Sequence, residues 1–128
     1  MTDSYFGKIV ASVEGLERHS DDVTIRFTDG SSFWMHHYQD CCENVWLADI
    51  DGEVNVGDVW HGFDERSEDK SGTMGENGYE CESATWTFYT LHTSKGYVWL
   101  RFIGESNGYY SEGVSHGYTE AGKERSRW

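Results

Sequence analysis

The feature that most constrains the fold is the stretch from Ala84 to Glu112, which contains two runs of aromatic and β-branched residues around a turn at Ser94-Lys95-Gly96. Runs of this composition on either side of a glycine-containing turn predict a β-hairpin. Alternate positions of each run lie on opposite faces of a strand, and both faces carry large rings. We therefore predict that the hairpin is the central strand pair of a sheet, with at least half of each face covered.

Other stretches predict strands over residues 6–16, 23–28, 31–37, 54–63 and 109–114. Within them Asp29-Gly30 is a tight-turn signal. Asp40-Cys41-Cys42-Glu43 has the pattern of a capping box, which predicts a short helix over Cys41–Ala48, although Val45-Trp46-Leu47 fits a strand equally well. The fold class expected is α+β: a mostly antiparallel β-sheet of about six to seven strands with one short helix.

The chain is strongly acidic. Its formal net charge is −13, from 23 Asp and Glu against 10 Lys and Arg in 128 residues. Residues 40–82 hold 13 of the acids and only Arg66 and Lys70, a local balance of −11. This excess disfavours direct binding of nucleic acid, because phosphate needs a basic surface, and it suits a basic groove on another protein. We expect one domain over residues 1–128, with a mobile acidic loop at 64–82 and a frayed tail at 120–128.

The acids of residues 49–82, with aromatic rings between them, form the first candidate site, a partner-binding surface. Carboxylates at roughly phosphate spacing can occupy a groove that otherwise holds DNA or RNA, with aromatic side chains as anchors. The competing interpretation is an ordinary solvated face. The residues assigned to this surface are Asp49, Asp51, Glu53, Asp58, Trp60, Asp64, Glu65, Glu68, Asp69, Glu76, Glu80 and Glu82.

Two polar stretches form the second candidate, a ligand site. Residues 36–43 offer imidazoles, thiols and carboxylates, which are zinc ligands, but they lack CxxC and HxxxH spacing. Residues 104–112 surround Asn107-Gly108, which fits a hairpin corner equally well. Helix-capping and core roles, a metal site and a nucleophilic cysteine are all left open for the first stretch, and an acid/base pair for the second. The residues assigned are His37, Asp40, Cys42, Glu43, Glu105, Asn107, Tyr109 and Glu112, with no catalytic residue, metal or cofactor.

Cysteine content and the start of the chain bear on location. An odd number of cysteines, with Cys41 and Cys42 adjacent and Cys81 apart, argues against a secreted disulfide framework. The first residues lack the basic and apolar regions of a signal peptide, and no apolar run approaches the ~18 residues of a membrane span. We expect a reducing cytosolic setting and no membrane partner.

Three motifs carry a resemblance to a known family. Residues 39–43 (QDCCE), 86–89 (WTFY) and 104–112 (GESNGYYSE) together resemble a family of small uncharacterised bacteriophage proteins over about residues 6–112. The resemblance implies a phage product acting in the host bacterial cytoplasm. The family has no assigned activity, so it implies no catalytic residue.

The charge and this resemblance lead to one expected function. It is a phage accessory protein that binds and inhibits a host protein with a basic groove, as an acidic nucleic-acid mimic of the anti-CRISPR or anti-restriction type. The alternatives are a small-molecule-binding protein or metal-dependent enzyme using the Cys41–Glu43 and Glu105–Glu112 stretches, and a virion or assembly component. A homodimer is left open.

Overall fold

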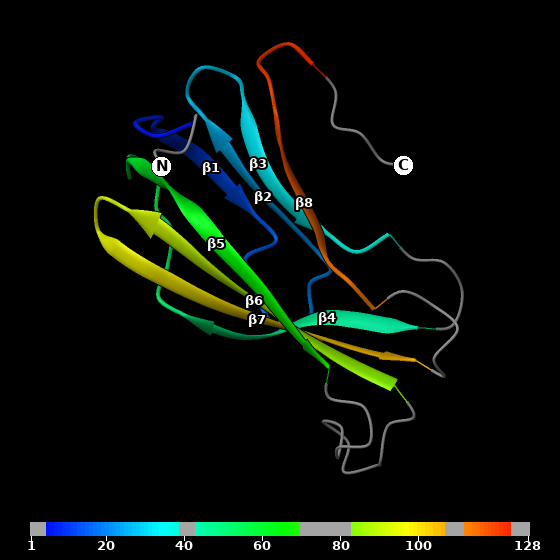
Figure 1. Ribbon diagram of the computed structural model, residues 1–128. Coiled ribbons are helices and arrows are strands. Elements are labelled where there is room, and N and C mark those ends of the chain that lie inside the picture. The colour runs from blue at the N-terminus through cyan, green and yellow to red at the C-terminus, as the bar shows by residue number, and fades with distance from the viewer. Residues whose placement is uncertain (1–4, 39–42, 70–82, 107–111, 124–128) are drawn as a thin grey trace.

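The protein is a sandwich of two four-stranded antiparallel sheets, seen in the computed structural model in Figure 1. The structure describes residues 5–38, 43–69, 83–106 and 112–123. The first sheet has the strand order β1-β2-β3-β8 and the second the order β4-β7-β6-β5. The strands are β1 (Val10–Glu14), β2 (Asp22–Phe27), β3 (Ser32–His36), β4 (Asn44–Asp51), β5 (Trp60–Asp69), β6 (Ser83–Thr93), β7 (Gly96–Ser106) and β8 (Ser115–Thr119).

The fold class is all-β, so the expected α+β fold with one short helix is wrong. No helix is present in the described residues, and most of the predicted helix, from Asn44 onward, belongs to β4. Val45 and Leu47 are buried there, and β4 pairs along its length with β7. Cross-strand pairing and burial of alternate residues outweigh the local capping signal. Within the described part of the chain, nothing helical has the length and hydropathy to span a bilayer.

The predicted hairpin is confirmed as the centre of a sheet. β6 and β7 pair from Ser83↔Ser106 to Thr93↔Gly96, with β5 and β4 on their outer edges. The first sheet packs on one face of the hairpin, and no second sheet packs on the other, where Ala84, Phe88 and Ile103 are nevertheless buried. The predicted tight turn between β2 and β3 is also present: Gly30 has φ +90°, and Asp29 accepts a hydrogen bond from the Ser31 backbone at 2.9 Å. Hydrogen bonds from Lys8 and then Ser31 hold the pKa of the Asp29 carboxyl well below its ordinary value.

Three strands differ from their predicted bounds. β1 is Val10–Glu14, shorter than the predicted strand over residues 6–16. β5 starts at Trp60 rather than at residue 54 and continues to Asp69, six residues into the stretch predicted as a loop. The last described strand is β8 (Ser115–Thr119); of the strand predicted at 109–114, residues 112–114 are not in a strand and the others lie outside the described residues. A charged strand at a sheet edge discourages pairing with other chains, and β5 carries this kind of sequence in Asp64-Glu65-Arg66.

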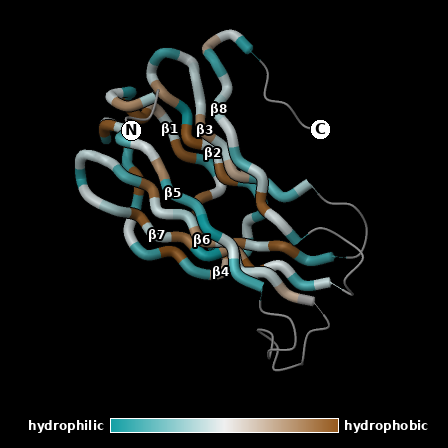
Figure 2. The backbone as a smooth tube through the Cα atoms, viewed as in Figure 1, coloured by the Kyte–Doolittle hydropathy of each residue, from teal (hydrophilic) through white to brown (hydrophobic). Residues whose placement is uncertain are grey.

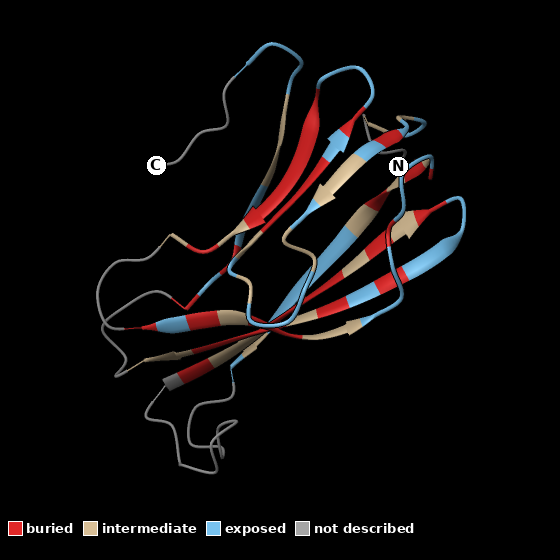
Figure 3. Cartoon of the chain, turned by 180° about the vertical axis from the view of Figure 1, so that it is seen from behind, coloured by how far each residue is buried: buried red, intermediate tan, exposed pale blue. Residues whose placement is uncertain are grey.

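The core fills the space between the sheets. Apolar residues alternate along the strands in Figure 2, and in Figure 3 buried residues alternate with exposed ones. Trp60 is fully buried, with its ring centroid 5.7 Å from that of Phe27 and 5.1 Å from that of Phe33. Its indole nitrogen donates a hydrogen bond to the hydroxyl of Tyr118 at 3.0 Å. Trp60 is therefore a core residue, which corrects its assignment to the partner-binding surface.

Candidate functional site

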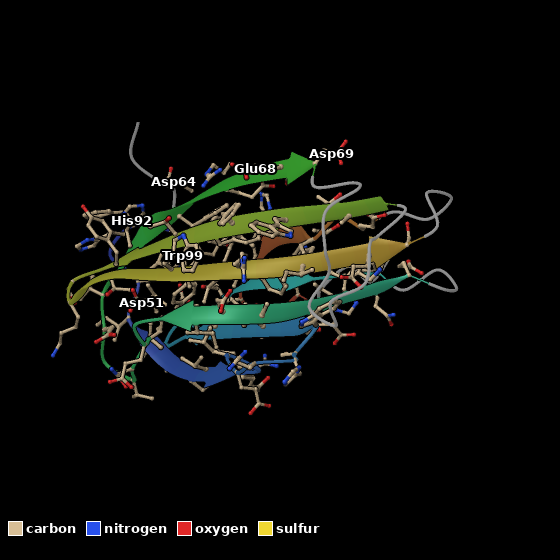
Figure 4. All side chains as sticks on the ribbon, turned by 90° about the horizontal axis from the view of Figure 1, so that it is seen from below. Asp51, Asp64, Glu68, Asp69, His92 and Trp99 are labelled. Atoms are coloured by element: carbon tan, nitrogen blue, oxygen red, sulfur yellow. The ribbon has the colours of Figure 1, made fainter. Side chains whose placement is uncertain are left out.

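The second sheet turns one face away from the first sheet, and we call it the outer face (Figure 4). Strand alternation directs onto it every second side chain of β4, β7, β6 and β5. The register aligns these side chains in rows that run across all four strands. The residues are Asn44, Trp46, Asp49 and Asp51 from β4; Tyr97, Trp99, Arg101, Ile103 and Glu105 from β7; Ala84, Trp86, Phe88, Thr90 and His92 from β6; and Asp64, Arg66 and Glu68 from β5.

Arg101 occupies the middle of this face. Its guanidinium carbon lies 4.4 Å from the centre of the Trp86 ring, and the group forms an ion pair with Asp49 on the neighbouring strand. Only 20% of the Arg101 side chain is exposed. A planar guanidinium suits this position because it can stack on a ring and bond a carboxylate at its edge.

Arg66 repeats the arrangement on β5. Its guanidinium carbon lies 4.1 Å from the centre of the Phe88 ring, and the group pairs with Glu68 on the same strand. Arg66 thus covers Phe88, which is 9% exposed although no other strand lies above it. The outer face therefore shields two of its rings with its own arginines.

Trp99 lies in the next row, Asp51–Trp99–Thr90–Asp64. It is 36% exposed, and its ring centroid is 5.7 Å from that of Phe88. Asp64 accepts a hydrogen bond from His92 Nε2 at 2.7 Å and remains largely exposed. Asp51, on the other side, has no ion pair within the described residues. This row therefore has an aromatic ring and flanking carboxylates but no guanidinium.

The outer face carries a net negative charge despite its two arginines. Five carboxylates (Asp49, Asp51, Asp64, Glu68 and Glu105) and two guanidiniums point to it, a balance of −3. Three acids of the first sheet and its turns lie beside basic side chains, in the pairs Glu14–Arg26, Asp22–His36 and Asp29–Lys8, and three of the outer face do so in the pairs Asp49–Arg101, Glu68–Arg66 and Asp64–His92. Most of the formal negative charge of the described strands still lies on the second sheet.

The structure brings together four of the predicted partner-binding residues. Asp49, Asp51, Asp64 and Glu68 share the outer face. Glu65 and Asp69 alternate to the opposite face of β5, Glu53 is exposed between β4 and β5, and Glu76, Glu80 and Glu82 lie outside the described residues. Asp58 is buried and accepts a hydrogen bond from the Asn55 backbone at 2.9 Å, so its assignment to the surface is corrected.

Glu65 has a distinct setting between the sheets. Its carboxylate lies 3.9 Å from His116 Nδ1 on β8. Burial first, and the charge of Glu65 second, raise the pKa of the Tyr89 hydroxyl well above its ordinary value. Glu65 therefore acts on the interior of the sandwich, whereas Asp64 beside it in sequence acts on the outer face.

The aromatic and arginine positions of the outer face were not predicted as site residues. Trp86, Trp99 and Arg101 lie in runs whose apolar alternation predicts strands, which assigns them to the fold, and Arg66 lies in the stretch predicted as an acidic loop. The available signal was that both faces of the hairpin carry rings. One of the two sets of rings must lie away from the main core, and the charged Arg101 in one set indicates which set that is.

The second candidate, the ligand site, lies at one end of the sandwich. His37 Nδ1 donates to the backbone oxygen of Gly113 at 2.8 Å, and His37 Nε2 is 2.9 Å from Glu43 Oε2. The exposed fraction of either side chain is 2% or less. These contacts join the end of β3, the start of β4 and the segment before β8, and we call the three residues the end cluster.

Glu112 adds to this end of the molecule. It is 6% exposed, accepts a hydrogen bond from Thr85 Oγ1 at 2.9 Å and another from the Ser106 hydroxyl. Its backbone oxygen would lie 2.6 Å from a Cβ atom at Gly104, so only glycine allows this approach. Glu105 points to the outer face by strand alternation, away from Glu112.

The predicted ligand-site residues are thus partly brought together. His37, Glu43 and Glu112 converge and bond to the protein itself, whereas Asp40, Cys42, Asn107 and Tyr109 lie outside the described residues. Among the side chains that the structure describes, no group of three or more His, Cys, Asp or Glu is arranged to hold a metal ion. A ligand site at this end stays a prediction.

Comparisons with known proteins identify a family but no activity. Neither a search of curated proteins nor a search of solved structures finds a match. One family model matches residues 3–116, which include seven complete strands and the start of β8. The chain therefore belongs to the family described as Domain of unknown function (DUF7448).

Proposed function

We propose that this chain is a protein-binding module that docks its outer face on a basic surface of another protein. The observation that supports it most is the row Asp51–Trp99–Thr90–Asp64, where an exposed ring lies beside carboxylates on a sheet whose net charge is negative. Rings supply buried area in protein interfaces, and carboxylates supply complementarity to lysine and arginine.

The partner class follows from the same charge. A chain with a net charge of −13 approaches cationic surfaces quickly and repels nucleic acid. Grooves that hold DNA or RNA are basic, because lysine and arginine in them neutralise the phosphates. We propose that the chain occupies such a groove as a nucleic-acid mimic and inhibits the protein to which the groove belongs. The resemblance to bacteriophage proteins points to a host defence nuclease, of the restriction or CRISPR type, in the bacterial cytoplasm.

A pair of charge-matched double variants tests the docking face. Asp64→Asn/Glu68→Gln removes two charges from the outer face, and Glu65→Gln/Asp69→Asn removes two from the other face of the same strand. We expect the first variant to capture its partners from a bacterial lysate about fivefold less than wild type at ~0.05 M salt, and the second to stay within about twofold. Quantitative mass spectrometry of the captured proteins measures both.

Competition completes this test. Duplex DNA or structured RNA, added to the lysate, should release the partners captured by wild type, because both ligands occupy one groove. Equal loss in the two double variants would mean that net charge alone drives capture. Retention in both variants, with no competition by nucleic acid, would refute the proposed function.

A further inference from the structure

The outer face holds two of the chain's own arginines in the same arrangement of ring and carboxylate. A third ring with neighbouring carboxylates is accessible to a guanidinium from another protein. Arg101 lies over Trp86 beside Asp49, and Arg66 lies over Phe88 beside Glu68. In each case the guanidinium lies over a ring and one of its nitrogens pairs with a carboxylate. A third aromatic ring of this face, that of Trp99, also has carboxylates in its row.

The register gives the dimensions of this third position. Asp51 is the direct cross-strand neighbour of Trp99, so the two Cα atoms lie about 5 Å apart. Asp64 lies two strands away on the other side, about 10 Å from Trp99 at the usual strand spacing. An arginine side chain laid on the Trp99 ring reaches Asp51 from there, and a second cation of the same segment reaches Asp64.

The position is accessible and its charge is uncompensated. Trp99 is 36% exposed, against 9% for Phe88, which Arg66 covers. No lysine or arginine pairs with Asp51 in the described part of the chain. Asp64 bonds His92 but keeps most of its side chain in solvent. Figure 4 shows Asp51, Trp99, His92 and Asp64 at the same end of the sheet, on four adjacent strands.

We propose that Trp99 and Asp51, with Asp64 at the rim, form a recognition site for an arginine side chain of the basic partner. The inference rests on the proposed function for the identity of the ligand as a protein. Arginine is favoured over lysine because the planar guanidinium stacks on the indole while it donates two hydrogen bonds to a carboxylate, and a compact ammonium does not combine the two contacts.

Two model peptides test the site without an identified partner. Hexa-arginine and hexa-lysine carry equal charge, so the ratio of their affinities removes the general attraction to an acidic protein. We expect hexa-arginine to bind wild type about fivefold more tightly than hexa-lysine at ~0.05 M salt, as measured by calorimetry. The indole N–H signal of Trp99, assigned by its loss in Trp99→Phe, should shift with hexa-arginine.

Substitutions assign this preference to the site. Trp99→Ala should reduce the affinity ratio to about one, and Trp99→Phe should keep part of it, because a phenyl ring still stacks. Asp51→Asn should weaken both peptides, more than Glu17→Gln, which removes the same charge next to the first sheet. Phe6→Ala removes an exposed ring that stacks on His61 and should leave the affinity ratio unchanged. Thermal unfolding of each variant confirms that it is folded.

The outcomes separate this inference from the proposed function. Equal affinity of the two peptides for wild type, or a preference that survives Trp99→Ala, would overturn the arginine site. If the preference is lost in Trp99→Ala while Asp64→Asn/Glu68→Gln still captures its partners fully, the arginine site stands and docking through the outer face falls. If that double variant loses its partners but Trp99→Ala leaves the ratio unchanged, docking stands and the arginine site falls.

Discussion

The His37–Glu43 contact holds a single proton. The Gly113 carbonyl can only accept, so His37 Nδ1 must carry a hydrogen. The contact between His37 Nε2 and Glu43 Oε2 at 2.9 Å then needs one more hydrogen, which lies on either atom. The pair has no net charge in either case, which suits two side chains that are almost fully buried. The end cluster therefore joins the two sheets without burying a lone charge.

Substitutions at Glu43 should distinguish a hydrogen bond from simple packing. Glu43→Gln keeps a donor opposite a neutral imidazole, and we expect it to lower the free energy of unfolding by about 1 kcal/mol or less. Glu43→Ala leaves His37 Nε2 unpaired and should lower it by about 2–3 kcal/mol. His37→Ala removes the imidazole partner of a buried carboxylate and should lower it by about 3–5 kcal/mol. Urea denaturation measures this series; a loss in Glu43→Gln equal to that in Glu43→Ala would contradict the shared proton.

At the scale of the strand, the residues just before β8 approach the second sheet closely. The backbone of Glu112 lies against β7 at Gly104, which has no side chain. Gly104 has no positive φ, so it is required there for space and not for backbone conformation. Glycine normally weakens a strand, but at this position the absence of a side chain allows the Glu112 backbone to approach β7 closely.

A comparison of two glycine variants tests that reading. Gly104→Ala places a Cβ 2.6 Å from a backbone oxygen of Glu112, and Gly117→Ala places one 2.8 Å from the ring edge of Trp34. A side chain can shift more easily than a backbone, so we expect Gly104→Ala to lower the free energy of unfolding by about 2–3 kcal/mol and Gly117→Ala by about 1 kcal/mol. Urea denaturation again gives the values, and the reverse order would refute this account of the β7–β8 segment.

The same elements show what the sequence could and could not predict. Alternation and the turns at Asp29-Gly30 and Ser94-Lys95 predicted β2, β3 and the central hairpin, because those signals are local. Alternation does not determine which strands pair. β8 pairs with β3, for example at Ser32↔Thr119, and this long-range pairing depends on packing. It also could not choose between helix and strand at Val45-Trp46-Leu47. The outer face depends on register across four strands, so its rows appear only in the folded chain.

At the scale of the whole molecule, negative charge opposes folding. The net charge of −13 is spread over a chain of 128 residues, and compaction brings these charges together. Ion pairs such as Arg26–Glu14 relieve part of this repulsion, but exposed pairs contribute little. Mobile ions screen the remainder over a distance of about 8 Å at 0.15 M salt.

Added salt should therefore stabilise the fold at neutral pH while it weakens docking. We expect the melting temperature to rise by about 4 °C between ~0.02 M and ~0.5 M sodium chloride, which corresponds to ~1 kcal/mol for a chain of this length. Near the isoelectric point of about 4.6 the same addition should change it little, because the net charge is then small. A melting temperature that falls with salt at neutral pH would mean that ion pairs outweigh the repulsion.

The order of strands also has a consequence for synthesis on the ribosome. The strands of the second sheet are consecutive in the sequence, between residues 44 and 106, so this sheet can assemble before β8 is in place. The first sheet is completed only when β8, the last of the described strands, pairs with β3. Until then the backbone N–H and C=O groups along that side of β3 have no strand to bond. A ribosome that stalls before Ser115 would leave the nascent chain with an open edge that attracts other polypeptides.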